Sequence, residues 1–305
     1  MNVLLRRSLA AWVLWAGVSH GLHAQELEPG AYSPAPVGMN ILVLADTFST
    51  GDLNFDPSGP IDEASADINN TIAGYVRTFG FAGRAASLGV ALPYVRGDLE
   101  GLVSGEPQSA HRSGWGDPRV RLAVNLHGVP ALAPKEFAAH QHPWTLGASL
   151  TLGLPLGQYH PDKLVNIGAN RWAAKPELGV TRTVGRWTVE AAAGAWLFTD
   201  NTDYYIGRTR EQDPIGSLQV HVIHTFRPRL WIAVDANFYN GGRTTIDGVR
   251  SDDLQSNSRI GCTFSLPLDR QHSLKFAYSR GAITRIGADF DSIGVSYQYV
   301  WGSAR

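Results

Sequence analysis

The chain has 305 residues, of which only 17% are charged, below the roughly 25% that is usual for soluble globular domains. Its net charge is −1, and without the first 24 residues it becomes −3, with 24 basic and 27 acidic side chains, which argues against a nucleic-acid-binding protein. The single cysteine, Cys262, excludes an intramolecular disulfide and a cysteine-based zinc cluster.

Residues 1–24 are predicted to form a secretory signal peptide. Arg6 and Arg7 precede the apolar stretch SLAAWVLWAGV, and small residues follow up to Ala24, where we expect cleavage. A proline-containing N-terminal segment, 25–36, then leads into the folded region, 37–305. No later apolar run approaches the ~18 residues of a membrane helix. The mature chain is therefore either secreted and soluble or spans a membrane as a barrel.

Twelve segments alternate between apolar and polar residues, as strands do. In the fifth, for example, Trp144, Leu146 and Leu150 share one face, and Thr145 and Ser149 share the other. No helical period of useful length competes with this alternation. In chain order, the predicted strands cover residues 37–48, 67–79, 82–95, 116–127, 143–154, 170–183, 186–198, 214–226, 229–239, 257–266, 272–280 and 287–301.

The connections between these strands alternate in length. The second, sixth, eighth and tenth are tight turns, whereas the first, third, fifth, seventh and ninth are long and rich in Gly, Asp, Asn and Pro. This alternation is typical of outer-membrane barrels, with short periplasmic turns and long outer loops. The fourth connection, 128–142, breaks the rule because it is long where a short turn is expected.

Strand length and aromatic placement favour a membrane barrel over a soluble β-protein. Strands of ten or more residues match the ~9–11 needed to cross a membrane. Aromatic side chains gather at the predicted membrane boundaries. They are Trp144, Trp187, Phe226, Tyr299 and Trp301 at the short-turn end, and Trp172 and Tyr94 towards the long loops. We predict an all-β, closed antiparallel transmembrane barrel of about twelve strands, in which the last strand pairs with the first; a soluble secreted β-protein is the alternative.

In such a barrel the polar faces line the lumen. One interpretation is a salt-bridged interior that holds the shape of the barrel; the other, compatible with it, is a pore lining that selects solutes. The predicted lumen-lining residues are Arg119, Arg121, Asn125, Arg171, Lys175, Glu177, Glu190, Gln219, His221, Asp235, Asn237, Arg259 and Lys275.

Two sequence patterns were weighed as sites of metal binding or catalysis. Oxygen-bearing residues are spaced like a calcium loop, but Pro57 stands where such a loop requires glycine, so a solvated outer loop is preferred. These residues are Asp52, Asn54, Asp56 and Glu63. His272 and Ser273 are adjacent rather than opposed, and no third group is placed to orient the histidine, so no catalytic site is predicted. No cofactor is expected.

A set of stretches along the chain carries a resemblance to a known family: 45–61, 88–97, 114–126, 151–172, 176–182, 199–205 and 239–248, with the terminal strand that closes in YQYVW. Together they resemble the meta-pathway phenol-degradation (MetA-pathway) family of outer-membrane transporters. The resemblance runs over nearly all of the mature chain. It implies an outer-membrane location and a role in passing hydrophobic or aromatic compounds, and it brings no catalytic motif.

The functional expectation is passive, channel-like passage of small hydrophobic or aromatic molecules across the outer membrane. The expected partners are outer-membrane lipids, the barrel assembly machinery and the solute; nucleic acid is not expected. One alternative is a structural or adhesive barrel with a blocked lumen. A second, of a different class, is a membrane-embedded lipid hydrolase.

Overall fold

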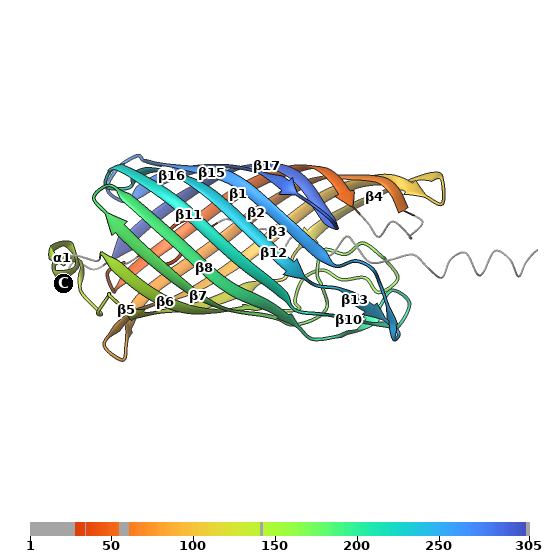
Figure 1. The fold of residues 1–305 in the computed structure, drawn as a ribbon, viewed down its shortest axis with the longest axis horizontal. Helices are drawn as coiled ribbons and strands as arrows, with labels where there is room; N and C mark the ends of the chain where they lie inside the picture. The colour runs from red at the N-terminus through yellow and green to blue at the C-terminus, as the bar shows by residue number, and fades with distance from the viewer. Residues whose placement is uncertain (1–27, 34, 55–60, 141–142, 303–305) are drawn as a thin grey trace, which may run out of the picture.

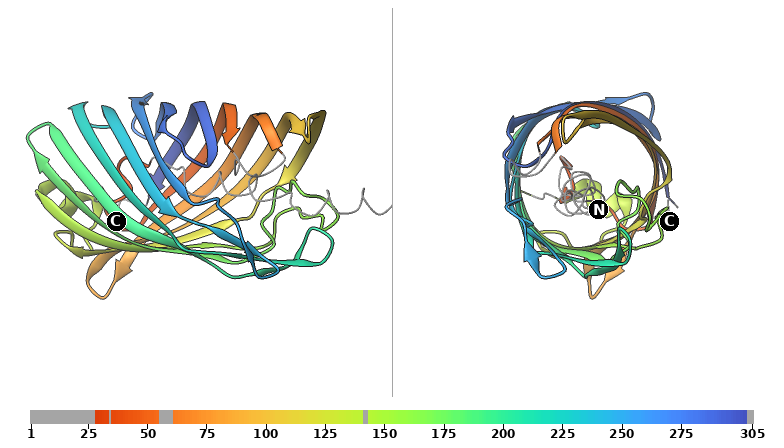
Figure 2. Two further views of the ribbon diagram at one scale, coloured as in Figure 1. Left: turned by 45° about the vertical axis from the view of Figure 1, so that its right-hand side comes forward. Right: turned by 90° about the vertical axis from the view of Figure 1, so that its right-hand side faces the viewer.

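The computed structural model describes residues 28–33, 35–54, 61–140 and 143–302, so the predicted signal peptide, 1–24, lies outside the described residues. Twelve antiparallel strands form a closed barrel (Figures 1 and 2), which confirms the predicted fold class. Each predicted strand has a counterpart. The barrel strands are β1 (Met39–Asn54), β2 (Ile61–Phe81), β3 (Arg84–Val103), β5 (Arg119–His127), β6 (Trp144–Gly153), β7 (Ala173–Val184), β8 (Trp187–Phe198), β11 (Ile215–Arg227), β12 (Leu230–Gly241), β15 (Gln255–Pro267), β16 (His272–Ile283) and β17 (Gly287–Gly302).

The first and last strands close the barrel. β1 pairs with β17 along its whole length, from Met39 opposite Gly302 to Asn54 opposite Gly287. An open edge in lipid would leave backbone N–H and C=O groups without partners, so this pairing is obligatory for a spanning sheet. The two ends of the barrel are called here the short-turn end, where β1 begins and β17 finishes, and the long-loop end.

The outer surface of the barrel is apolar and the inner surface polar. On β12, for example, Val234 is 65% exposed while its neighbour Asp235 is 1% exposed. A soluble barrel would show the reverse, because its apolar face packs inside. The apolar face of the sheet therefore meets lipid.

One part of the barrel wall continues beyond the apolar band. β2 and β3 are the longest strands, and a further strand, β4 (Glu106–Trp115), pairs with the upper half of β3. On β3 the exposed side chains are apolar from Leu88 to Leu92 and charged from Arg96 to Glu100. The first two long connections are thus mostly strand rather than loop. Their exposed faces are polar, so apolar alternation, the signal used to find strands, is absent there.

The seventh and ninth connections carry a small sheet of their own. Its strands are β9 (Asn201–Tyr204), β10 (Arg208–Gln212), β13 (Thr244–Ile246) and β14 (Val249–Arg250). The connection 128–142 contains the six-residue helix α1 (Pro134–Ala139), too short to leave a helical period in the sequence. Among the described residues, no helix is long and apolar enough to cross a membrane.

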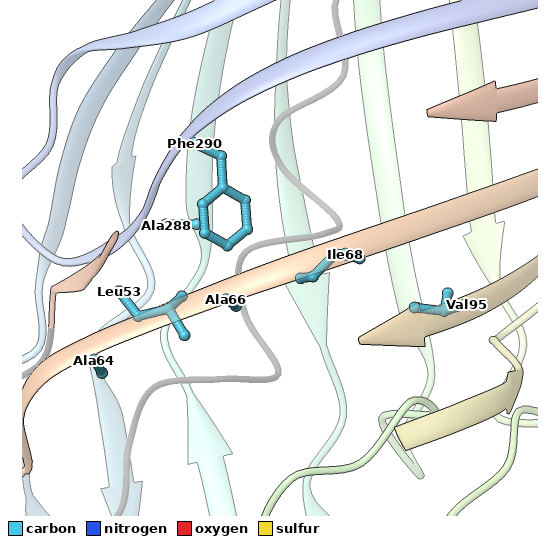
Figure 3. Packing of buried hydrophobic residues seen from close by; sticks show 7 residues of the cluster. All are labelled: Leu53, Ala64, Ala66, Ile68, Val95, Ala288 and Phe290. Atoms are coloured by element: carbon cyan, nitrogen blue, oxygen red, sulfur yellow. The ribbon is translucent and has the colours of Figure 1, made fainter. Parts of the chain in front are cut away.

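A group of apolar side chains packs inside the barrel near the long-loop end (Figure 3). Its members come from β1, β2, β3 and β17. Leu99, also of β3, and Ile167 of the long loop between β6 and β7 pack against them. We call it the apolar cluster; it consists of Leu53, Ala64, Ala66, Ile68, Val95, Ala288 and Phe290.

Candidate functional site

The start of the described chain lies inside the barrel. Residues 28–33 and 35–37 lead to the start of β1 at the short-turn end, and Figure 2 (right) shows this red segment within the ring of strands. Its root is fixed by hydrogen bonds: the Val37 N–H donates to the Leu132 carbonyl (2.9 Å), and the Thr78 hydroxyl donates to the Pro36 carbonyl (2.7 Å). This stretch, which we call the inner segment, therefore occupies part of the lumen.

Tyr32 attaches the inner segment to the barrel wall. Its side chain is 4% exposed. The phenol oxygen lies 2.8 Å from the Ser149 hydroxyl and donates a hydrogen bond to Glu177 Oε1 (2.9 Å). Its backbone N–H donates to Glu190 Oε2 (3.2 Å). One residue thus joins three neighbouring strands, β6, β7 and β8.

The ring of Tyr32 lies in a recess made by two glycines. Gly147 of β6 and Gly179 of β7 are direct register partners on the inner face. A Cβ atom at Gly147 would lie 2.7 Å from the ring, and one at Gly179 would overlap it. Because real Cβ atoms do not approach this closely, only glycine at both positions allows the ring to lie flat along the wall. We call Gly147, Gly179, Ser149, Glu177 and Arg121 the Tyr32 socket.

Two basic side chains lie next to the carboxyl group of the socket. Lys175 Nζ lies 2.5 Å from Glu177 Oε2, and Arg121 Nη2 lies 4.0 Å from Glu177 Oε1. The Arg121 guanidinium also lies over the Tyr32 ring, 5.1 Å from its centroid, in a cation–π arrangement. Because Lys175 contacts Oε2, the other oxygen, Oε1, is the one that accepts from the phenol hydroxyl.

A second polar group continues around the wall. His221 Nδ1 lies 2.7 Å from Asp235 Oδ1, and the Thr263 hydroxyl donates to Asp235 Oδ2 (2.8 Å). His221 is also the register partner of Glu190, which receives the Tyr32 backbone N–H. The inner segment is therefore attached to a connected set of buried polar groups rather than to one isolated residue.

Two cavities lie on either side of the inner segment. The first has a volume of about 220 Å³ and is lined by Tyr32, Arg121 and Asn125, among others. The second has a volume of about 250 Å³ and is lined by Trp231 and Lys275, among others. Both also contact Gly30 and Ser33, so the inner segment divides this part of the lumen in two.

The remaining predicted lumen residues have varied surroundings. Lys275 Nζ lies 5.4 Å from the centroid of the Trp231 ring. Arg259 donates to the Phe290 carbonyl (2.8 Å), which links it to the apolar cluster. Gln219 and Asn237 are buried, while Arg119 and Asn125 are half-buried.

Arg171 differs from the rest, because it precedes β7 rather than lying within a strand. Its guanidinium lies over the Phe198 ring, 4.3 Å from the centroid, and donates to Gln212. Burial, and then the nearby charge of Arg210, lower the pKa of Arg171 to about 9. It therefore remains a cation at neutral pH.

The predicted aromatic belt lies on the outer surface. At the short-turn end, the rings of Tyr299 and Trp301 stack with centroids 5.0 Å apart. Towards the long loops, Tyr94 meets Trp115 edge to face at 5.2 Å. The other belt residues, all exposed, are Trp144, Trp172, Trp187 and Phe226.

The four residues that are spaced like a calcium loop do not form a metal site among the described residues. Asp52 and Asn54 belong to β1 and Glu63 to β2, while Asp56 lies outside the described residues. In the described part of the chain, no group of three or more His, Cys, Asp or Glu side chains is placed to hold a metal ion.

The side chains of His272 and Ser273, the pair considered for the lipid-hydrolase alternative, also point away from each other. Successive strand side chains point to opposite faces of the sheet. Accordingly, His272 Nδ1 lies 2.5 Å from the Tyr297 hydroxyl, and the Ser273 hydroxyl accepts from Arg229 (3.2 Å).

The sequence does not predict the centre of the site. Tyr32 falls in the linker-like N-terminal segment, and Gly147, Gly179 and Ser149 are polar-face positions of predicted strands. The available signal was a lone tyrosine in the proline-rich stretch EPGAYSPAP, together with glycines at inward positions of two adjacent strands. Their meeting depends on strand register, which alternation alone does not specify.

A family model described as "Putative MetA-pathway of phenol degradation" matches residues 45–295. The chain belongs to this family. Membership, together with the apolar outer surface, makes this an outer-membrane barrel, so the short-turn end faces the periplasm and the long-loop end the exterior.

Several solved structures are similar to this chain. An outer membrane channel from Pseudomonas putida F1 has 22% sequence identity over 90% of this chain and 100% of its own, with a TM-score of 0.75, and shares the fold. The β domain of the Bordetella autotransporter BrkA has 14% identity over 87% of this chain and 100% of its own, with a TM-score of 0.49. The Pseudomonas putida toluene transporter TodX has 13% identity over 90% of each chain, with a TM-score of 0.44. No curated protein matches the sequence.

Proposed function

We propose that this barrel is a passive outer-membrane channel for small hydrophobic or aromatic molecules. The observation that carries the proposal is a polar lumen with two cavities, of about 220 and 250 Å³, in a member of a family described for phenol degradation. Pockets for drug-sized ligands begin at about 300 Å³, so these spaces suit a molecule of about one ring. The solved structure with the higher TM-score is itself described as an outer membrane channel.

The inner surface offers such a solute two successive environments. At the long-loop end the inner face of the wall carries the apolar cluster, with Phe290 and Ile68 among its buried members. Further in, the wall is polar, and the two cavities lie on either side of the inner segment. A barrel of twelve strands lies between the side-chain-filled barrels of eight strands and the open porins of sixteen, which fits a narrow route.

Flux through the reconstituted full chain tests the proposal. We expect liposomes containing the protein to take up phenol faster than protein-free liposomes, and planar bilayers to show conductance. Ala123 lines the first cavity and Thr225 the second, so the Ala123→Trp/Thr225→Trp variant should lower the flux severalfold. Absence of both conductance and solute flux in the unaltered protein would instead support the structural or adhesive barrel.

The C-terminal strand is proposed to be the segment that the barrel assembly machinery recognises. Its stacked aromatic pair, Tyr299 and Trp301, faces outward at the membrane boundary. Replacing both by Ser should reduce insertion into the outer membrane, measured as the amount of heat-modifiable barrel on gels. Tyr278→Ser is the matched control, because Tyr278 is exposed on the neighbouring β16 and not on the terminal strand. Equal insertion of the two variants would contradict this role.

The lipid-hydrolase alternative requires His272 and Ser273 to act together, and their side chains have different partners. We expect Ser273→Ala to leave any lipid hydrolysis by the purified protein unchanged. Loss of a measurable hydrolysis in that variant would revive the alternative.

A further inference from the structure

The Tyr32 socket recognises every part of a phenol. Gly147 and Gly179 provide a flat surface for the ring, and the Arg121 guanidinium lies 5.1 Å from its centroid. Ser149 and Glu177 lie within 2.8 and 2.9 Å of the hydroxyl oxygen. The side chain of tyrosine is a phenol substituted at the para position, so the socket is already a phenol site with a covalently tethered occupant.

We propose that the Tyr32 socket is a binding site for free phenols, which compete with the ring of Tyr32 for it. This inference rests on the proposed channel function, because the solute must enter the lumen to reach the socket. It adds to that function a chemical class, neutral phenols with a small or no para substituent, and a defined place where they bind.

The polar groups of the socket select the hydroxyl. A phenol has an ordinary pKa near 10 and is neutral at pH 7, so it donates a hydrogen bond as Tyr32 does. Glu177, paired with Lys175 at 2.5 Å through its other oxygen, accepts it. An aromatic hydrocarbon such as toluene donates no hydrogen bond to Glu177 Oε1, and a site built around a hydrogen bond discriminates strongly against a ligand that lacks it.

The surroundings of Tyr32 allow the exchange. The cavity of about 220 Å³ is lined by Tyr32 itself and by Arg121, so a solute in that cavity lies next to the socket and a displaced ring has space to enter. Outside the socket, the residue is held by the bond from its N–H to Glu190 (3.2 Å) and by a long bond from the Thr181 hydroxyl to its carbonyl (3.5 Å). Exchange of the ring therefore gives up few other contacts.

Competition between a free phenol and the Tyr32 ring has a consequence for the passage of solutes through the channel. While Tyr32 fills the socket, the inner segment is attached to β6, β7 and β8 between the two cavities. When a phenol takes the place of the ring, the segment keeps its root at Val37 and Thr78 and its bond to Glu190 of β8, but loses the attachment of the ring to β6 and β7. Phenol should therefore raise the conductance of the channel at concentrations that fill the socket, which toluene at the same concentration should not do.

Equilibrium dialysis of purified full-length protein with p-cresol, the free counterpart of the tyrosine side chain, tests the proposal. We expect one saturable site, with binding about tenfold tighter in Tyr32→Ala, because removing the resident ring raises the competent fraction of sockets. In Tyr32→Ala/Gly179→Val, the valine side chain fills the empty recess. This double variant should bind no more p-cresol than the detergent takes up by itself. Gly216→Ala is the matched control, since a Cβ there is 3.7 Å from its nearest neighbour.

The outcomes separate this inference from the channel proposal. Equal p-cresol binding by Tyr32→Ala and Tyr32→Ala/Gly179→Val would overturn the socket inference, even with solute flux intact. Saturable binding without flux would uphold the socket and overturn the channel. If the Gly179→Val barrel fails the heat-modifiability check, Gly147→Ala takes its place, because its Cβ also collides with the ring at 2.7 Å.

Discussion

Two regions of the inner surface differ in what holds them together. Around the Tyr32 socket the wall consists of glycines and hydrogen-bonded polar side chains, whereas the apolar cluster near the long loops packs Leu53, Ile68 and Phe290 against one another. Both lie inside the same barrel. What differs is the solvent outside: lipid surrounds the first region, and water surrounds much of the second.

The change of solvent reverses the alternation of the strands. On β3 the outward residues Leu88 and Leu92 are apolar, but further along the outward Asp98 and Glu100 are charged while Val95 is buried inside. A membrane barrel thus becomes an ordinary soluble barrel where its strands leave the bilayer. Where the strands extend beyond the bilayer, hydrophobic burial drives side-chain packing inside the barrel. Within the bilayer, networks of polar side chains have that role.

Removing the shared acceptor of the polar wall should have the largest effect on stability. Asp235 is 1% exposed and binds both His221 (2.7 Å) and Thr263 (2.8 Å). Deleting Asp235 leaves both of these buried partners unsatisfied, which costs about 1–3 kcal/mol for each of them. We expect the free energy of unfolding of Asp235→Ala, measured by urea titration in lipid vesicles, to fall by about 4 kcal/mol. A loss below about 1 kcal/mol would mean that the network contributes little net stability.

Truncation in the apolar cluster should cost slightly less. Phe290 is 4% exposed, and a buried Phe→Ala change costs about 3 kcal/mol or more through lost burial and the cavity left behind. The matched variant Phe290→Leu keeps most of the volume and should cost less than about 1.5 kcal/mol. Because the cluster and the polar wall are separate, the losses of Phe290→Ala and Asp235→Ala should add within about 0.5 kcal/mol in the double variant.

The reversed alternation of apolar and polar residues where the strands leave the bilayer also explains which parts of the fold the sequence predicts. All twelve barrel strands were predicted, because lipid imposes apolar alternation on each one and the aromatic residues mark its ends. The upper parts of β2 and β3, and all of β4, were missed because no lipid imposes that pattern there. The Tyr32 socket was missed for a different reason. Gly147 and Gly179 form the recess only because they are register partners, and the register of two strands is set by the whole barrel.

Anchoring of a long loop to the cluster should have an intermediate effect. Asp117 is 5% exposed and accepts hydrogen bonds from the backbone N–H groups of Gly157 and Ala169, both at 2.8 Å. Between these two lies Ile167, which packs on the apolar cluster. Asp117→Asn turns one acceptor into a donor facing an N–H, at a cost of about 1–3 kcal/mol. We expect faster hydrogen exchange of the 157–169 amides, with the exchange of β7 and β8 unchanged; equal acceleration throughout would indicate global destabilisation instead.

The smallest effect is expected in the outer sheet, which faces water on the exterior and belongs to neither inner region. Asp247 accepts from the Thr209 backbone N–H (2.9 Å) and pairs with Arg208 (2.8 Å), and these bonds hold its pKa below the ordinary value. A carboxyl whose pKa is lowered on folding contributes stability above its unfolded pKa, near 3.9, and loses it as the pH falls through the folded value. Exchange of the Thr209 amide, corrected for its intrinsic pH dependence, should therefore rise as the pH falls below about 4. Asp247→Asn should be fast at every pH, and a pH-dependent rise that persists in this variant would assign the effect to another group.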